Sequence, residues 1–279
     1  MTIVFPSSYM SGRRVDEAFE REYEAALAAG LAAALFRQEL WDEERKVRLD
    51  QEISGPALYR GWMMKPEEYE LCYEALTETG LNLFTAPPQY AAMHIFPNVY
   101  RYLQEDTPKT LFFPLHARMD VGEIREQLGD FLIKDHVKSA KNTDFPAFFG
   151  GDMTQEEFAR WMERFYEIRG ELLTGGILAK QYVRLKQYDG HTNEYRVFYL
   201  RGHIVSVSRN SLQPGFTAEL PRSLAEKYAA LPSPFYTVDY GEKEDGNWTV
   251  IEAGDGGVSG LSEGQDCGAF FRAVKAILL

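Results

Sequence analysis

The stretch that decides the fold is Tyr236–Gly257, YTVDYGEKEDGNWTVIEAGDGG, in which two alternating apolar segments flank the dipeptide Asp245-Gly246. Asp-Gly favours a two-residue hairpin loop of type I′, because both central residues of that turn need a positive φ. Such a loop places Asp239 opposite Glu252, while the apolar neighbours of these residues point to the other face. The sequence therefore predicts two carboxylates side by side on one face of a hairpin, with Cβ atoms about 5 Å apart.

This carboxylate pair is a candidate metal site. Two ionised carboxylates so placed repel each other by roughly 3 kcal/mol at an effective dielectric constant of 20, and a cation between them removes the repulsion. Asp255, three residues beyond Glu252, could supply a third oxygen ligand beside Asp239. Oxygen ligands without a nearby His or Cys favour Mg²⁺ or Mn²⁺ over zinc. The alternative is a solvent-facing hairpin with an acidic wet side, but the glycines of Gly254–Gly257 leave the backbone open to a close ligand.

Composition limits the class of protein. A hydrophobic content of 45% over 279 residues is typical of a folded chain with one large or two modest domains. The net charge of −12 argues against a nucleic-acid or membrane partner, although a local Lys and Arg cluster can still bind a nucleotide. Cys72 and Cys267 lack motif spacing, which argues against disulfides and a thiolate metal site. Without a signal sequence or an apolar run of about 18 residues, we expect a cytoplasmic protein.

The predicted secondary structure changes near residue 117. Before it, short apolar runs alternate with helical periodicity, which predicts a small α/β lobe with a parallel sheet over residues 1–117. Its expected strands are Thr2–Phe5, Leu31–Phe36, Ala57–Arg60, Leu81–Phe84 and Thr110–Phe113, and its expected helices are Val15–Ala29, Pro66–Thr79 and one or two within Pro87–Gln104.

Residues 118–279 are expected to form an α+β region with an antiparallel sheet. The expected strands are Phe131–Lys134, Ile177–Leu185, Glu194–Leu200, His203–Ser208, Phe235–Tyr240 and Trp248–Ala253. The expected helices are Val121–Leu128, Thr154–Ile168, Leu220–Ala230 and Gln265–Leu278. Thr154 and Glu157 form a capping-box pattern, and Arg201-Gly202 is a tight-turn candidate between two strands.

A lysine-rich segment, FLIKDHVKSAK at residues 131–141, is the candidate phosphate-binding element. On a strand, Lys134 points away from the face of its apolar neighbours, and Lys138 and Lys141 follow in a loop. Two or three ammonium groups so placed could bind a polyphosphate as point charges. The alternative is a solvated Lys-rich loop, and the chain contains no GxxxxGK[ST] motif.

Two later strands carry further candidates. The segment LAKQYVRL, residues 178–185, could offer backbone groups to an adenine edge, with Gln181 adding a side-chain contact. In EYRVFYLRG, Arg196 lies on a half-buried strand and needs an anion, which could be a carboxylate such as Glu194 or a phosphate oxygen. A structural ion pair and a phosphate contact are equally compatible with this pattern.

In combination these segments resemble the ATP-grasp superfamily over about Asp120–Leu279. The order is similar: a strand with Lys134, a hinge strand, an E-x-R-V-x-x-x-x-G-x-I strand pair, then the acidic hairpin ending in V-I-E. KDHVKSAK, EYRVFYLRG and IEAGDGGVSGL look most like a branch long catalogued as a domain of unknown function, with a hallmark of two arginines and a lysine. The resemblance implies an ATP-grasp-like fold, α+β with antiparallel sheets, preceded by the small α/β lobe.

The resemblance also implies roles for particular residues. Lys134 and Arg196 would be catalytic, with Arg196 near the γ-phosphate or an acyl-phosphate. The residues implied to bind ATP are Lys134, Lys138, Lys141, Lys180, Gln181, Tyr182, Val183 and Glu194, and those implied to hold Mg²⁺ or Mn²⁺ are Asp239, Glu252 and Asp255. Many ATP-grasp hairpins end in E-x-N, whereas here Gly254 takes the Asn position, so Asp255 must replace that ligand or it is missing. HVKSAKN stands in place of the usual glycine-rich loop, and Gln181 stands where an acidic residue is common.

The function implied is an ATP-dependent ligase that activates a carboxylate as an acyl-phosphate for attack by an amine or similar nucleophile. The protein would supply alignment and charge neutralisation. Its substrate would be a small-molecule or peptide carboxylate. An alternative is an ATP-binding assembly factor or chaperone with the same fold, a protein client and no ligation. A third is an α/β protein with an acidic hairpin and no nucleotide.

The acceptor site has two arginine candidates. Arg60 follows an expected strand of the first lobe, and α/β sheets bind ligands at the carboxyl ends of their strands, so it could bind a substrate carboxylate. Arg209 is the second candidate. A structural role is the alternative for Arg60. The histidines lack ligand spacing and are assigned no role.

Overall fold

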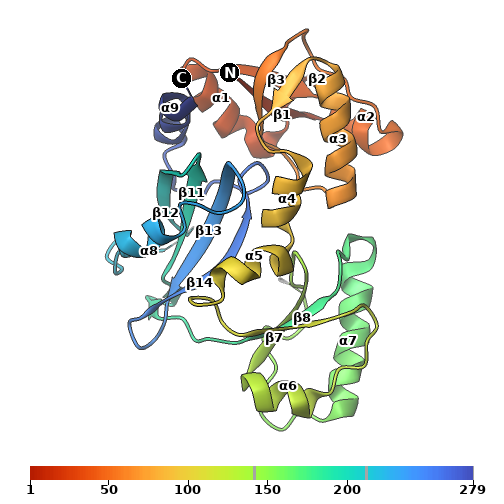
Figure 1. Ribbon diagram of the computed structural model, residues 1–279, viewed down its shortest axis with the longest axis vertical. Coiled ribbons are helices and arrows are strands. Elements are labelled where there is room, and N and C mark those ends of the chain that lie inside the picture. Colours follow the sequence, from red (N-terminus) through yellow and green to blue (C-terminus); the bar gives the residue numbers. More distant parts are fainter. Residues whose placement is uncertain (141–142, 211–212, 279) are drawn as a thin grey trace.

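The structure, a computed structural model, describes residues 1–140, 143–210 and 213–278 (Figure 1). In the view of Figure 1 an N-terminal lobe lies at the top, a four-stranded sheet below it, and a three-stranded sheet with two helices at the bottom. The two termini lie near each other at the top, so the last helix packs against the first lobe.

The N-terminal lobe contains the strands β1 (Thr2–Ser8), β2 (Ser11–Val15), β3 (Ala32–Phe36), β4 (Gly55–Tyr59) and β5 (Leu81–Leu83). Its helices are α1 (Glu20–Ala28), α2 (Gln38–Glu44) and α3 (Pro66–Glu78). β3, β1, β4 and β5 are neighbours in parallel, which confirms the predicted parallel sheet. The predicted helix Val15–Ala29 begins too early, because Ser11–Val15 pairs with β1 as an antiparallel strand.

Two short helices, α4 (Pro87–His94) and α5 (Phe96–Leu103), connect the lobe to the rest of the chain. The break between them falls just before Pro97, as the sequence predicts. Both helices pack on the four-stranded sheet, where Met93, Phe96 and Val99 are buried in its core. They therefore form one wall of the space between the two antiparallel sheets.

The three-stranded sheet consists of β6 (Thr110–Phe113), β7 (Phe131–Asp135) and β8 (Ile177–Gln181), in the order β6-β8-β7, all antiparallel. α6 (Val121–Leu128) and α7 (Gln155–Arg169) bury its outer face around an aromatic core. Thr154 and Glu157 make the predicted capping box at the start of α7. β6 precedes residue 117, where we predict a division, yet it pairs with β8 and not with the N-terminal sheet.

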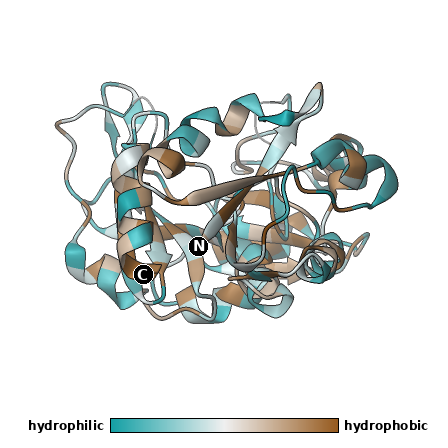
Figure 2. Cartoon of the chain, turned by 90° about the horizontal axis from the view of Figure 1, so that it is seen from above, coloured by the Kyte–Doolittle hydropathy of each residue, from teal (hydrophilic) through white to brown (hydrophobic). Residues whose placement is uncertain are grey.

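The four-stranded sheet has the order β12-β11-β13-β14, with β11 (Glu194–Leu200), β12 (His203–Arg209), β13 (Phe235–Glu242) and β14 (Trp248–Asp255). The short strands β9 (Gln187–Tyr188) and β10 (His191–Thr192) precede it, α8 (Arg222–Lys227) packs on one face, and α9 (Cys267–Leu278) packs on β12 and α1. Figure 2 shows brown and teal segments alternating along the helices, as expected of helices that bury one side. The predicted antiparallel sheet is confirmed.

The β13–β14 hairpin reaches the predicted carboxylate pairing by a different route. Its loop has three residues, 244–246, because the Lys243 N–H donates to the Asn247 carbonyl at 2.7 Å and only Gly246 has a positive φ, +81°. The predicted two-residue type I′ loop is therefore wrong. The type I′ pattern occurs instead at Arg201-Gly202, with φ of +49° and +79°, where the tight turn was expected.

A bulge at Ile251 restores the register of the hairpin. A two-residue loop would place Ile251 beside Tyr240, but the structure pairs Tyr240 with the fully buried Val250. Beyond the bulge Asp239 lies opposite Glu252, as predicted. The one-residue shift at the loop and the one-residue bulge cancel, so the pairing that matters for the site is confirmed.

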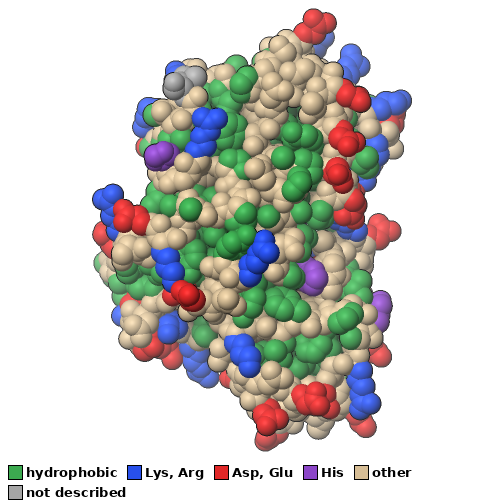
Figure 3. Space-filling model, in the orientation of Figure 1, with side chains coloured by type: hydrophobic (Ala, Val, Ile, Leu, Met, Phe, Trp, Pro, Cys, Tyr) green, Lys and Arg blue, Asp and Glu red, His purple; other side chains and the backbone are tan. Residues whose placement is uncertain are grey.

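The surface agrees with the expectation from net charge. On the face in Figure 3, Lys and Arg side chains are interspersed with Asp and Glu side chains around a centre of apolar and uncharged residues. Across the described ranges, no helix is both long and apolar enough to cross a membrane.

Candidate active site

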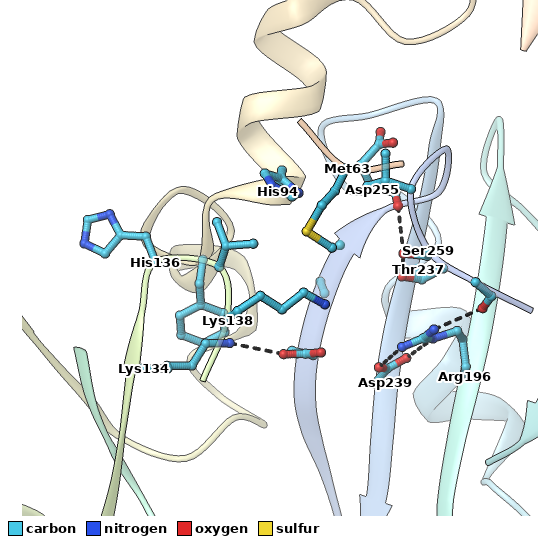
Figure 4. Close-up of a pocket in the computed structure, with 17 residues that line it drawn as sticks. Met63, His94, Lys134, His136, Lys138, Arg196, Thr237, Asp239, Asp255 and Ser259 are labelled. Atoms are coloured by element: carbon cyan, nitrogen blue, oxygen red, sulfur yellow. Dashed lines mark hydrogen bonds and ion pairs between the residues drawn. The ribbon is translucent and has the colours of Figure 1, made fainter. Parts of the chain in front are cut away.

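Two adjoining cavities lie between the sheets. The central cavity, of about 100 Å³, is bounded by β7, β11, β13 and β14 and reaches Met63 of the N-terminal lobe (Figure 4). The side cavity, of about 280 Å³, is lined by Glu194, Asn210 and Ile251. Both are lined by Arg196, Asp239 and Glu252. Together they reach the size of typical ligand sites, about 300–1,000 Å³.

The two predicted metal carboxylates lie side by side, and each pairs with a cation. Asp239 accepts two hydrogen bonds from Arg196, at 2.8 Å from Nε and 2.6 Å from Nη2. Glu252 Oε2 lies 3.1 Å from Lys134 Nζ. Burial lowers the pKa of Arg196, but its hydrogen bonds and charge attraction to Asp239 outweigh this and raise the pKa above its ordinary value. Mutual repulsion of the carboxylates is thus relieved within the protein.

Lys134 and Lys180 form a second charged pair. They share one face of the three-stranded sheet, because Leu132, two residues before Lys134, lies opposite Lys180. Both ammonium groups lie over the ring of Phe96, at 5.5 and 4.6 Å from its centre. Lys180 Nζ donates to Thr107 Oγ1 at 3.0 Å, and burial, reinforced by the Lys134 charge, lowers the pKa of Lys180 to about 7.

The loop after β7 brings a further cation to the central cavity. A turn closes at Lys138, whose N–H donates to Asp135 Oδ1 at 2.6 Å. Figure 4 shows the Lys138 side chain extending across the cavity toward β14. Lys141 lies outside the described residues.

The hinge segment after β8 is partly occupied by contacts within the protein. The Gln181 N–H donates to the Lys109 carbonyl and the Tyr182 N–H to the Asp130 carbonyl, each at 2.8 Å. The Tyr182 ring stacks on Phe148, with 4.3 Å between ring centres. An adenine edge at 181–183 would therefore meet groups other than these two N–H donors.

Glu194 lies on the same face of β11 as Arg196, and it lines the side cavity. It accepts a hydrogen bond from the Thr192 hydroxyl. The Arg196 guanidinium pairs with Asp239 and not with Glu194, a choice that the sequence alone leaves open.

Asp255 does not join the other two carboxylates. It is 1% exposed, and its Oδ1 accepts the Gly257 N–H at 2.8 Å while Oδ2 has no hydrogen-bond partner in the described parts of the chain. Burial raises the pKa of Asp255 to about 7, against the opposing effects of the Gly257 N–H and the Arg60 charge. Among the described residues no group of three or more His, Cys, Asp or Glu side chains could hold a metal ion.

The remaining pair, Asp239 and Glu252, fits a magnesium ion that is shared with a ligand. Mg²⁺ in proteins is commonly held by one or two carboxylates, with water and substrate phosphates completing its octahedron. Carboxylates paired across neighbouring strands supply hard oxygen ligands of this kind.

The structure corrects both arginines expected at the acceptor site. Arg60 is fully buried and makes a bidentate ion pair with Glu22 of α1, so it does not present its side chain to a substrate. Arg209 donates to Thr217 Oγ1 at 3.2 Å and lies over the Tyr195 ring. Its position in β12 is on the face opposite Arg196, because it pairs with Tyr195.

Two contributors to the site were missed. Phe96 supports both lysine ammonium groups, and the Gly260 carbonyl accepts a hydrogen bond from Arg196 Nη1 at 3.0 Å. An aromatic residue in a helix is usually core, and a backbone carbonyl leaves no trace in the residue type. Neither had a signal in the sequence.

The buried His94 gives a prediction about pH. It stacks on Tyr90, and burial, with the nearby Lys138 and Lys134 charges, lowers the pKa of His94 to about 4 against the opposing Asp135 charge. Below the ordinary pKa of about 6.5 the unfolded chain therefore binds the proton first, so stability is lost as pH falls from 6.5 to 4. His94→Phe should keep the stacking and lose about 2 kcal/mol less stability than wild type between pH 7 and 4.5, measured by urea unfolding. Parallel losses in the two proteins would refute this account.

The opposed antiparallel sheets, with lysines on one facing carboxylates on the other, define the ATP-grasp class of fold. The chain belongs to an ATP-grasp domain family, family 3 of the clade known by its two arginines and one lysine, whose model matches residues 121–274, more than half of the chain. This confirms the superfamily that the sequence motifs indicate.

Solved structures with the same fold align over nearly the whole chain. The ATP-grasp ligase PsnB complexed with minimal precursor, Mg and ADP aligns with a TM-score of 0.60 and 14% identity, over 99% of this chain and 97% of that chain. D-cycloserine synthetase DcsG gives 0.61 and 16%, over 100% of both. D-alanine–D-alanine ligase from Bacillus anthracis complexed with ATP gives 0.60 and 12%, over 99% and 95%. A search of curated proteins gave no match.

Proposed function

We propose that this protein is an ATP-dependent ligase that activates a carboxylate as an acyl-phosphate for attack by an amine or similar nucleophile. The observation that carries the proposal is the Lys134–Glu252 contact of 3.1 Å across the two sheets, with Lys180 beside it. It places phosphate-binding cations against metal-binding carboxylates, which is the charge arrangement that phosphoryl transfer requires.

ATP would occupy both cavities. Glu194 in the side cavity suits ribose hydroxyls, because a carboxylate accepts the hydrogen bonds they donate. The triphosphate would then extend into the central cavity toward Lys134, Lys180 and Lys138. Asp239 and Glu252 would hold Mg²⁺, which neutralises phosphate charge when bound.

Arg196 is the residue we assign to the reacting phosphate. Its guanidinium lines both cavities and lies beside the metal carboxylate Asp239. A planar, permanently charged donor there stabilises the charge that develops on the transferred phosphoryl group. The acceptor carboxylate would enter from the N-terminal side of the central cavity, where Met63 and Val258 form the wall.

The similar structures support this class of reaction. PsnB was solved with a peptide precursor, Mg and ADP, and the Bacillus anthracis ligase with ATP. We therefore propose ATP and Mg²⁺ as the cofactors and a small-molecule or peptide carboxylate as the substrate class.

Calorimetric titration of Mg·ATP into wild type and Lys134→Met tests the proposal. The variant loses a charge-assisted hydrogen bond to phosphate, so its Kd should rise about tenfold to a hundredfold. Lys46→Met is the matched control, because Lys46 pairs with Glu44 on the exposed surface of the N-terminal lobe. Its Kd should stay within about twofold of wild type.

The outcomes separate the candidate functions. ADP release that depends on an added carboxylate and amine supports the ligase. Tight Mg·ATP binding without such turnover would favour the assembly-factor alternative. No binding by the wild type would contradict a nucleotide site altogether.

A further inference from the structure

Arg60 is a buried cation for which ATP chemistry gives no direct role. It follows β4 in the N-terminal lobe, and its Nε and Nη2 bind Glu22 at 2.8 and 2.7 Å. Taking two charges out of water costs several kcal/mol, so a buried ion pair is a poor source of stability compared with apolar packing. A reason for the pair is to be sought in what else the guanidinium holds.

The third nitrogen of Arg60, Nη1, binds the segment that follows β14. We call Asp255–Gly260 the β14 loop. Nη1 donates to the backbone carbonyls of Gly256 and Ser259, the second at 2.7 Å. One planar side chain thus fixes two carbonyls of the loop relative to α1.

Backbone contacts reinforce this attachment. The Gly61 N–H donates to the Gly257 carbonyl at 3.0 Å. A Cβ on Gly257 would lie 2.8 Å from the carbonyl oxygen of Tyr59, so a side chain there would force the loop away from the lobe. The β14 loop is therefore seated directly on the end of β4.

The far end of the same loop holds Arg196. Arg196 Nη1 donates to the Gly260 carbonyl at 3.0 Å, while its other nitrogens bind Asp239 (Figure 4). The Arg60 guanidinium also lies 5.7 Å from the ring centre of Phe198, which shares its face of β11 with Arg196. Two routes thus connect the two arginines, one through the loop and one through β11.

We propose that Arg60 is a positioning residue that orients Arg196 toward the γ-phosphate of bound ATP, an inference that rests on the proposed function. Arg60 fixes the carbonyls of Gly256 and Ser259, and Gly260 follows directly. The Gly260 carbonyl in turn sets the plane of the Arg196 guanidinium. A lysine at position 60 cannot reproduce this, because one ammonium group lacks the planar fork that serves Glu22 and the loop together.

The test compares the affinities of Mg·AMPPNP and Mg·ADP, which differ in the γ-phosphate and require no acceptor. Calorimetry would be run on wild type, Arg60→Lys, Arg196→Lys and the double variant. Wild type should prefer Mg·AMPPNP by about tenfold, the value of one charge-assisted hydrogen bond. Each single variant should reduce this preference to about threefold or less and leave the Mg·ADP affinity within about twofold. The double variant should match Arg196→Lys, because residues acting through one contact are not additive.

Arg125→Lys is the matched control. Arg125 likewise donates to a carbonyl, that of Met153, at 2.7 Å, but it lies in α6 away from the cavities. It should keep the wild-type preference. Glu22→Gln replaces Arg60→Lys if that variant does not fold, and it should lower the preference in the same direction.

Three results would overturn the inference. The first is an unchanged preference in Arg60→Lys. The second is an equal loss of Mg·ADP and Mg·AMPPNP affinity, which a purely structural role predicts. The third is independent, multiplicative losses in the double variant. Wild type that binds neither nucleotide would instead contradict the proposed function.

Discussion

Glu252→Gln should reduce ATP-dependent turnover by about a thousandfold, the largest loss we expect from a single substitution. The change keeps the size of the side chain but removes one of the two carboxylates that fit Mg²⁺. It also leaves Lys134, only 9% exposed in its side chain, without the carboxylate it contacts at 3.1 Å. Metal binding and the placement of the lysine are therefore lost together. ADP release and Mg·ATP calorimetry measure the two effects.

Glu244→Gln is the control for this substitution. Glu244 lies in the loop of the same hairpin and is exposed, so the same chemical change there should alter turnover by less than about twofold. Unchanged Mg·ATP binding in Glu252→Gln would remove the hairpin from the nucleotide site. Equal losses in the two variants would show that the hairpin acts through folding.

The local part of the site was readable from the sequence because it depends on alternation within single strands. Lys134, Arg196, Asp239 and Glu252 each follow from the two-residue period of a strand. The hairpin loop was predicted with the wrong type, yet the pairing of Asp239 with Glu252 survived because the bulge at Ile251 compensated. A period-two argument is exposed to such one-residue errors, and here two of them cancelled.

The remaining part depends on contacts between residues far apart in the chain. Arg60 meets Glu22 on α1 and the carbonyls after β14, and nothing near Arg60 in the sequence indicates either partner. Asp255 looks like a third metal ligand by spacing, but its carboxylate turns back to the Gly257 N–H. β6 has the composition of its predicted lobe, and only its pairing with β8 shows where it belongs. Tertiary pairing of this kind has no local signal.

Metal and nucleotide should bind together, each raising the affinity for the other. Without nucleotide, Glu252 pairs with Lys134 and Asp239 with Arg196, so a free divalent cation must displace or approach a positive group. A triphosphate supplies Lys134 with a new anion and frees Glu252 for the metal. Because coupling between sites is reciprocal, Mn²⁺ should bind about tenfold to a hundredfold tighter in the presence of AMPPNP, and AMPPNP should gain the same factor from Mn²⁺. Electron paramagnetic resonance of Mn²⁺ titrations measures the first and calorimetry the second.

Lys134→Met separates this mechanism from simple loss of a site, because its two effects have opposite signs. Removing the ammonium group exposes Glu252 to the metal, so Mn²⁺ alone should bind more tightly than to wild type. The same variant should bind AMPPNP more weakly, and the coupling between the two ligands should shrink. Lys46→Met should leave all three quantities unchanged. Weaker Mn²⁺ binding in Lys134→Met, or equal Mn²⁺ affinity of wild type with and without AMPPNP, would contradict the exchange of partners. The ion pairs that neutralise the carboxylates before ATP arrives are thus expected to make the metal site conditional on the nucleotide.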